Sequence, residues 1–388
     1  MYEVTLKRGK ENRAKSHPWI YANEVEKVTG KDKQGSVAKV LAYDGSFLGY
    51  GFINHASKIF IRILSRKESQ TFDNAFFESL LYKAIEKREK LGFTEACRLV
   101  FGESDDLPGL IVDKYGEYLS VQFLSLGMEL LKETIVNALV QKLAPKGIYE
   151  RSDSSVREKE GLQQTKGLLY GEVPPLITFT ENGVLTSVSL AEGQKTGYFL
   201  DQRRNRLRFG DYAKGKRVLD CFSNVGGFAL QAAKNGAKEV VALDASPAAV
   251  ALIRQNASQN GLSVTALEKD VFEALREYRK EGEKFDLICL DPPAFIKTVD
   301  SVQRGYEGYR DINVLALKLL EKDGILFTCS CSQHLTVELF LKMLRESARY
   351  ANSDVSLLEF SIQNADHACK ITEEEALYLK VAVLRKNG

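Results

Sequence analysis

Apolar and polar residues alternate along the first 68 positions of the chain, and glycine-containing turns separate the alternating runs. The segments 35–43 and 58–64 show the period of two that is typical of half-buried β-strands. Short strands at this spacing predict a small β-barrel over residues 1–68.

The next part of the chain mixes helical and strand patterns. A charged segment predicts a helix over about 72–92, and a second helix is predicted over 129–142. Strands are predicted between 110 and 126, and the polar, glycine-bearing stretch 152–171 is predicted to be a loop. Together these elements predict a middle α+β domain over residues 69–174.

The third part, residues 175–388, opens with alternating segments on both sides of Asn182-Gly183, which is a strong signal for a β-hairpin. Beyond this hairpin, apolar runs of strand length alternate with amphipathic helical segments. The alternation predicts a Rossmann-like α/β domain with a mostly parallel, twisted sheet.

Aspartates stand at or next to the ends of four predicted strands in this domain: Asp220, Asp244, Asp270 and Asp291. The carboxyl ends of parallel strands meet at one edge of an open α/β sheet, and ligands bind in the crevice outside that edge. A single such acid is more often a solvated turn residue. Four in series indicate a ligand site.

A turn follows the first of these strands and contains the candidate ligand contacts Phe222, Ser223, Asn224 and Gly226. Its adjacent glycines, 226 and 227, lack the G-x-G-x-x-G spacing of dinucleotide sites. The turn therefore favours a smaller cofactor without a pyrophosphate.

Asp244 stands where a pair of ribose hydroxyls would be bound, and Asp270 where the edge of an adenine would lie. Further candidate contacts follow these two acids: Ala245, Ser246, Val271 and Phe272. Either a nicotinamide ribose or an adenosyl ribose would fit Asp244.

The apolar run 285–290 stops at Asp291-Pro292-Pro293, because the prolines lack the N–H groups that a strand ladder needs. A short polar residue before two prolines at this edge resembles the fourth motif of class I S-adenosylmethionine-dependent methyltransferases. That motif presents a planar base or amide to the methyl donor. The resemblance implies S-adenosylmethionine as the cofactor.

Further motifs give a more specific resemblance, to the bacterial and archaeal 23S ribosomal RNA cytosine-C5 methyltransferases with an N-terminal PUA domain. It rests on residues 16–19, 106–116, 192–205, 222–228, 291–295, 329–332 and 365–367, and runs nearly end to end. It implies that residues 1–68 bind RNA and that the substrate is 23S ribosomal RNA. It also implies six more cofactor contacts: Gln194, Thr196, Phe199, Asp201, Arg203 and Asn205.

Carbon 5 of cytosine is a poor nucleophile, but addition of a thiolate at carbon 6 makes the ring an enamine that can attack a methyl group. The predicted strand 324–332 places Cys329 and Cys331 on the same face. The resemblance identifies Cys331 as the nucleophile, and Asp291 is expected to hydrogen-bond the N3 and N4 edge of the base. Cys329 is interpreted as a packing residue. The proton-abstracting base stays open among His367, Asp291 and water.

The net charge is only +2, but basic residues cluster in 7–15 and 203–217, and such clusters supply phosphate contacts. No apolar run reaches the roughly 18 residues of a membrane span, and the first residues do not resemble a signal peptide, so a cytoplasmic location is expected. The six cysteines are then expected to be reduced thiols. We expect no metal site, and homodimer formation stays open.

Three alternatives remain. The run 291–295 also resembles the Asp-Pro-Pro-Tyr motif of amino-group methyltransferases, which act on an exocyclic base nitrogen without a covalent step. A catalytically idle RNA-binding or assembly protein would keep the fold for stability alone. A nicotinamide oxidoreductase is disfavoured by the glycine spacing.

Overall fold

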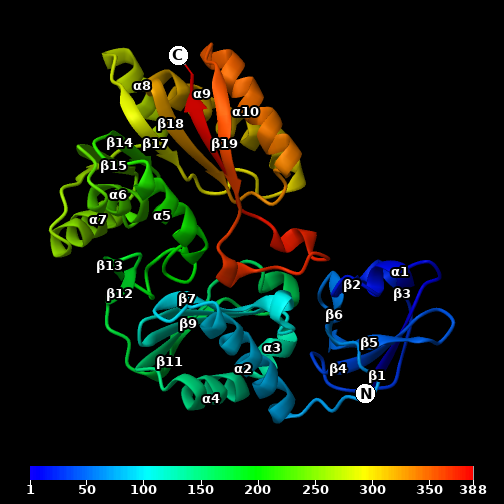
Figure 1. Cartoon of the computed structure of the whole chain (residues 1–388). Helices are drawn as coiled ribbons and strands as arrows, with labels where there is room; N and C mark the ends of the chain where they lie inside the picture. Colours follow the sequence, from blue (N-terminus) through cyan, green and yellow to red (C-terminus); the bar gives the residue numbers. More distant parts are fainter. Residues whose placement is uncertain (388) are drawn as a thin grey trace. The chain divides into compact units, whose positions relative to one another are not determined.

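The computed structural model describes residues 1–387, which form two compact units (Figure 1). The first unit consists of Met1–Ile177, Ser189–Tyr198 and Asp366–Ala376. The second consists of Thr178–Val188, Phe199–Ala365 and the chain from Leu377 onward. Both units are therefore discontinuous in sequence.

The first unit begins with a six-stranded sheet in the order β2-β6-β5-β4-β1-β3. Its strands are β1 (Tyr2–Leu6), β2 (Trp19–Tyr21), β3 (Val25–Thr29), β4 (Val37–Leu41), β5 (Phe47–Ile53) and β6 (Ile59–Ser65). Buried aliphatic side chains such as Val4, Ile20 and Ile61 form its core. The strands predicted from alternation in this region are confirmed.

A five-stranded sheet follows in the order β11-β10-β9-β8-β7, and three helices pack on it (Figure 1). The elements are α2 (Asn74–Lys90), β7 (Ala96–Phe101), β8 (Leu110–Tyr115), β9 (Tyr118–Phe123), α3 (Leu126–Leu130), α4 (Lys132–Leu143), β10 (Gly147–Ser152) and β11 (Thr165–Gly171). The predicted mixture of helices and strands is confirmed.

Two predictions for this region are wrong in detail. The helix expected over 129–142 is interrupted at Leu131, where α3 ends and α4 begins. The loop expected over 152–171 contains β11, an edge strand antiparallel to β10. Most side chains of β11 are exposed, so apolar alternation does not mark this strand.

Polar contacts join the two sheets of the first unit. Arg62 of β6 forms ion pairs with Glu103 and Glu160, with N–O distances of 2.6 and 2.9 Å. The side-chain amide of Asn54 also donates to Glu160. The indole N–H of Trp19 donates to Glu103 at 2.7 Å. These contacts are buried or half-buried, so the two sheets stabilise each other.

The hairpin predicted around Asn182-Gly183 is confirmed. It consists of β12 (Ile177–Glu181) and β13 (Val184–Val188), which pair with each other. Asn182 and Gly183 have φ angles of 51° and 73°. Two consecutive positive φ angles are what a type I′ turn requires.

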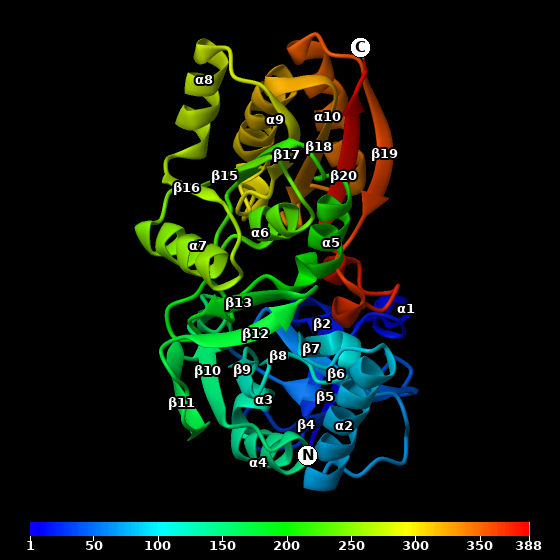
Figure 2. The same ribbon diagram turned by 60° about the vertical axis from the view of Figure 1, so that its left-hand side comes forward.

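The second unit is built on a seven-stranded sheet in the order β16-β15-β14-β17-β18-β20-β19 (Figure 2). Its strands are β14 (Arg217–Cys221), β15 (Glu239–Asp244), β16 (Thr265–Glu268), β17 (Phe285–Leu290), β18 (Leu320–Ser330), β19 (Val355–Ser361) and β20 (Lys380–Lys386). Neighbours among β14 to β18 are parallel, and β20 is antiparallel to β18 and β19. The predicted, mostly parallel sheet is confirmed.

Helices cover both faces of this sheet (Figure 2). They are α5 (Arg203–Asp211), α6 (Gly227–Lys234), α7 (Pro247–Gln259), α8 (Val271–Glu281), α9 (Val302–Leu319) and α10 (Val337–Ala351). One apolar core joins the sheet to α8, α9 and α10, and another joins it to α5, α6 and α7. Because both faces are buried, ligands can reach only the edges of the sheet.

The predicted division into domains 1–68, 69–174 and 175–388 stays a proposal. The two sheets of the first unit lie within the first two of these ranges. Ser189–Tyr198 and Asp366–Ala376 fall in the third range but belong to the first unit.

Candidate active site

The carboxyl ends of β14, β15, β17 and β18 lie side by side along one edge of the seven-stranded sheet. The register pairs Cys221 of β14 with Leu243 of β15 and with Leu290 of β17, and β17 is in turn paired with β18. Asp291 directly follows β17, and Cys331 directly follows β18. The structure therefore brings the two predicted catalytic residues to one edge of the second unit.

The turn after β14 has an unusual backbone. Phe222, Asn224 and Gly226 have φ angles of 62°, 53° and 93°. A bulky aromatic residue rarely adopts a positive φ, and such strain is concentrated at ligand sites. The N–H of Ser223 donates to the carbonyl of Leu243 at 2.9 Å and ties the turn to β15. The turn leads directly into α6, whose first N–H groups face the same edge.

Asp220 is fully buried at the end of β14. Its Oδ2 accepts hydrogen bonds from the hydroxyl of Ser223 and the N–H of Ala229, at 2.5 and 3.0 Å. Among the described residues its Oδ1 has no hydrogen-bond partner, and neither does the buried Oδ1 of Asn224. Burial raises the pKa of Asp220 to about 7. These two acceptors fit a ligand that is rich in hydrogen-bond donors. S-adenosylmethionine is such a ligand, because its ammonium group, ribose hydroxyls and adenine amino group all donate.

Asp244 is the last residue of β15 and is half-buried. Its Oδ2 accepts from the N–H of Asn224 and its Oδ1 from the N–H of Ser246, both at 2.9 Å. These bonds fix the carboxylate, and each oxygen keeps a lone pair for a ribose hydroxyl. The hydroxyl of Ser246 caps α7 by accepting from the N–H of Ala249. Ala245 is exposed beside them.

Asp270 lies beyond the strand that was expected to end there. Strand β16 ends at Glu268, and the exposed Asp270 caps α8 by accepting from the N–H of Glu273 at 3.0 Å. The side chain of Val271 is buried in the core, whereas Phe272 is only partly buried. An adenine contact of this segment stays a prediction.

Three aromatic rings pack near this edge. The ring of Phe295 lies 5.8 Å from that of Phe272 and 6.3 Å from that of Phe222, measured between centroids. All three are partly exposed. They provide an apolar wall on which a planar base or adenine can stack.

A chain of side-chain hydrogen bonds ends at Asp291. The hydroxyl of Ser361 donates to Asn205, the amide of Asn205 donates to Gln202, and the amide of Gln202 donates to Oδ1 of Asp291, at 2.7, 2.7 and 2.9 Å. Asn205 was expected to contact the cofactor, whereas Gln202 was not expected to act at all. The spacing of three between Gln202 and Asn205, at the start of a helix, was the only signal for their contact.

The other residues expected around the cofactor make structural contacts. Oδ2 of the buried Asp201 accepts from the hydroxyl of Tyr378 at 2.6 Å. The carbonyl of Arg203 accepts from Asn182, and that of Phe199 accepts from Arg206. Their roles as cofactor contacts stay predictions.

Gln194 and Thr196 belong to the first unit. The hydroxyl of the buried Thr196 donates to Oδ2 of Asp113, which also pairs with Arg98. Gln194 is exposed. Their contact with a cofactor stays a prediction.

The two cysteines at the end of β18 differ in burial. Cys329 is completely buried in the core against α5, α6 and α7, and burial raises the pKa of its thiol. Cys331 is partly exposed and packs against the same core. The interpretation of Cys329 as a packing residue agrees with this geometry.

His367, one candidate for the base, is buried in the first unit. Its Nδ1 lies 2.9 Å from Oδ1 of Asp366, whose Oδ2 accepts from the N–H of Arg98. The carbonyl of Asp366 accepts from the guanidinium of Arg88 at 2.8 Å. The loop thus has a structural role in its own unit, and the base is not identified.

Three of the seven basic residues of the cluster 203–217 are paired with acids. Arg206 forms a buried ion pair with Glu181 at 2.6 Å, Arg208 pairs with Glu359, and Arg217 pairs with Glu239 and Glu283. These contacts correct the expectation that the whole cluster supplies phosphate contacts. Their charges are already compensated within the second unit.

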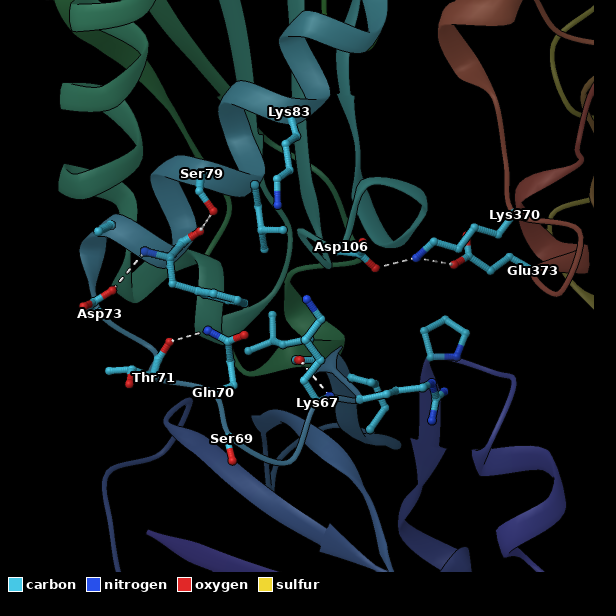
Figure 3. A pocket seen from close by; sticks show the side chains of 18 of the residues that line it. Lys67, Ser69, Gln70, Thr71, Asp73, Ser79, Lys83, Asp106, Lys370 and Glu373 are labelled. Atoms are coloured by element: carbon cyan, nitrogen blue, oxygen red, sulfur yellow. Dashed lines mark hydrogen bonds and ion pairs between the residues drawn. The ribbon is translucent and has the colours of Figure 1, made fainter.

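A cavity of about 880 Å³ lies in the first unit (Figure 3). Figure 3 shows Lys370 between Asp106 and Glu373, at 2.6 and 3.7 Å from their carboxylates. None of the strand-end residues lines this cavity, so it is not the candidate active site. Over the described residues, no helix is long and apolar enough to span a membrane, and no cluster of potential metal ligands is present.

Comparisons with known proteins agree with this geometry. The profile of the S-adenosylmethionine-dependent methyltransferases matches residues 163–370, and that of PUA-like domains matches residues 4–66. The chain is 43% identical over 377 residues to the ribosomal RNA large subunit methyltransferase I of Tolumonas auensis, with 95% of each chain covered. It is 41% identical over 386 residues to the protein of the same name from Escherichia coli O157:H7, with 97% of each covered.

Solved structures show the same fold over the whole chain. A Streptococcus mutans protein assigned as a SAM-dependent methyltransferase aligns with a TM-score of 0.84 at 23% identity, covering 99% of this chain and 100% of that one. A structure of a methyltransferase complexed with SAH gives the same values. The chain therefore belongs to the S-adenosylmethionine-dependent methyltransferases, and within them to the family of ribosomal RNA large subunit methyltransferase I.

Proposed function

We propose that this protein methylates carbon 5 of a cytosine in large-subunit ribosomal RNA, with transient addition of Cys331 to carbon 6. The names of relatives at 41% and 43% identity support ribosomal RNA as the substrate class. One observation carries the covalent route. Asp291 and Cys331 directly follow two paired parallel strands, and Cys331 is partly exposed, whereas Cys329 is buried.

Asp291 is suited to orient the base. Its carboxyl group can accept a hydrogen bond from the N4 amino group of cytosine and, when protonated, donate one to N3, which makes carbon 6 more electrophilic. The amide of Gln202 donates to Oδ1 of Asp291 at 2.9 Å and limits rotation of the carboxyl group. Because this hydrogen bond fixes Oδ1, it also fixes the direction of Oδ2 of Asp291.

The thiolate of Cys331 forms a bond to carbon 6, the electron pair of the 5,6 double bond moves into the bond between carbons 4 and 5, and the pair of the 3,4 double bond moves to N3. Carbon 5 of the resulting enamine then forms a bond to the methyl carbon as the 3,4 double bond re-forms. Bound S-adenosylmethionine supplies an electrophilic methyl group, and S-adenosylhomocysteine is the product. A base removes the proton from carbon 5. Those electrons re-form the double bond as the bond between sulfur and carbon 6 breaks, which releases Cys331.

Substitution of the two cysteines tests this route. Cys331→Ala is expected to bind S-adenosylmethionine normally and to lose methyl transfer by on the order of 10³-fold or more, because carbon 5 is then not activated. Cys329→Ala is the matched control. It leaves a cavity in the core, so it should lower the melting temperature more than the rate.

RNA that contains 5-fluorocytidine gives an independent readout. Fluorine cannot leave carbon 5 as a proton does, so the wild-type protein should form an RNA adduct that survives a denaturing gel. Cys331→Ala should form none. An active Cys331→Ala protein, or one that traps this RNA, would reject the nucleophile and favour methylation of an exocyclic nitrogen.

A further inference from the structure

Lys380 is a buried cation close to the proposed nucleophile. It is the first residue of β20, and the antiparallel register pairs it with Ser330 of β18. Its Nζ donates to the carbonyl of Ser332 at 2.7 Å. Ser330 and Ser332 flank Cys331, so the ammonium lies against the short segment that carries the thiol.

The environment of Lys380 is unfavourable for an isolated charge. The residue is only 3% exposed. Among the described residues no carboxylate forms an ion pair with it, and its hydrogen bond goes to a backbone carbonyl. Burial lowers the pKa of Lys380 to about 8, while the charge of Cys331 acts in the opposite direction. A buried ammonium is costly unless an anion compensates it.

The groups around the thiol come from several elements. Tyr309 of α9 has its hydroxyl 2.8 Å from Oγ of Ser332. Burial and the charge of Cys331 raise the pKa of Tyr309 to about 12, so it is neutral at physiological pH. Asp291 follows β17, and Cys329 precedes the thiol on β18. Asp201 adds a second carboxylate near Cys329. Lys380 brings a positive charge to the segment 330–332 beside these groups.

We propose that the ammonium of Lys380 holds Cys331 in its thiolate form. Lys380 then is a positioning residue that acts through Cys331 and does not touch the base. The thiol proton is released to solvent, and the thiolate compensates the buried ammonium until sulfur bonds to carbon 6 of the substrate. The importance of this pair for catalysis rests on the proposed function, but its existence in the free protein does not.

Lys386 offers a matched comparison on the same strand. Its Nζ donates to the carbonyls of Leu317 and Leu320 at 3.1 and 2.8 Å, and burial lowers its pKa as well. Lys386 is the last residue of β20, whereas Lys380 is the first and is paired with Ser330, next to Cys331. If Lys380 had only a structural role, its substitution should affect the cysteines no more than substitution of Lys386 does.

The pH dependence of alkylation by iodoacetamide tests the pair. Peptide mass spectrometry of the full-length protein reports Cys331 and the partly exposed Cys369 in the same sample, and burial raises the pKa of the Cys369 thiol. We expect the midpoint of the Cys331 profile to lie at least one pH unit below that of Cys369. An equal or higher midpoint for Cys331 would overturn the proposal without any variant.

Variants then separate charge from hydrogen bonding. Lys380→Gln keeps a donor for the carbonyl of Ser332 but removes the charge, so alkylation of Cys331 at pH 7 should slow about tenfold and recover near pH 9. Lys380→Arg should keep the low midpoint, and Lys386→Gln should change neither cysteine. An unchanged Cys331 midpoint in Lys380→Gln would overturn the proposal. If this variant does not fold, the wild-type and Lys380→Arg profiles decide.

Methyl transfer by the same variants links the pair to function. Lys380→Gln should lower the rate at pH 7 about tenfold, with recovery at high pH and unchanged affinity for S-adenosylmethionine. Activity in Cys331→Ala would reject the proposed nucleophile, while the alkylation profiles would still report the pair. The two failures are therefore distinguishable.

Discussion

We expect the buried carboxyl group of Asp220 to couple cofactor binding to pH. Its pKa is raised to about 7 by burial, so the group is mostly protonated at pH 6 and mostly ionised at pH 8. A ligand that donates to Oδ1 favours the ionised form, so affinity should rise with pH through this range. At pH 6 only about a tenth of the group is ionised, which predicts roughly tenfold weaker binding than at pH 8.

Calorimetry with S-adenosylmethionine at pH 6, 7 and 8 measures this effect. Asp220→Asn keeps the shape but cannot ionise, so its affinity should be low and nearly independent of pH. A wild-type affinity that does not change over this range would show that Oδ1 does not bind a ligand donor.

Only part of the candidate site could be predicted at the level of residues. Asp220, Asp244 and Asp291 could be placed because each is at or next to the end of an apolar run of strand length. Gln202 and Lys380 could not, because their contacts join positions 89 and 48 residues apart. No local pattern distinguishes such a lysine from the other basic residues.

At the scale of elements, the ion pair between Arg206 of α5 and Glu181 of β12 holds helix and hairpin together. Both side chains are about 4% exposed, and the pair is bidentate with distances of 2.6 and 2.9 Å. Substitution of Arg206 removes the bidentate cation from the buried carboxylate of Glu181. We therefore expect Arg206→Ala to lower the free energy of unfolding by about 3–5 kcal/mol.

Chemical denaturation measures this loss, and the exposed Arg204 on the same helix is the control. Arg204→Ala should change stability by less than about 0.5 kcal/mol. If both substitutions have equally small effects, the prediction for Arg206 is wrong. The expectation that the arginines of 203–217 supply phosphate contacts would then be favoured again.

Strands that read as continuous apolar runs were predicted correctly, and the exposed strand β11 was not. The strands β14, β15 and β17 are buried on both faces and read as continuous apolar runs. Strand β11 is exposed and is held by backbone pairing to β10, which leaves no signal in side-chain polarity. The break between α3 and α4 lies at Leu131, where no proline or glycine gives a local signal.

At the scale of the whole molecule, the first 68 residues cannot be removed without damage to the rest of their unit. Glu160 is 3% exposed and accepts from Asn54, Ser57 and Arg62, all of which lie in this segment. A truncation would remove these three donors from Glu160 and would also take Phe52 and Leu64 out of the apolar core around α2. The role of the PUA-like domain in RNA binding therefore has to be tested by surface substitutions.

Lys7, Lys10 and Lys15 are exposed on the PUA-like domain and form no ion pair among the described residues. If this surface contacts phosphates, replacing all three lysines by glutamine should raise the KM for ribosomal RNA several-fold and reduce its dependence on salt. Affinity for S-adenosylmethionine should not change. The control replaces three exposed lysines of the second unit by glutamine: Lys238, Lys322 and Lys342. An unchanged KM in the first variant, or the same increase in both, would remove the N-terminal lysines from the RNA-binding surface.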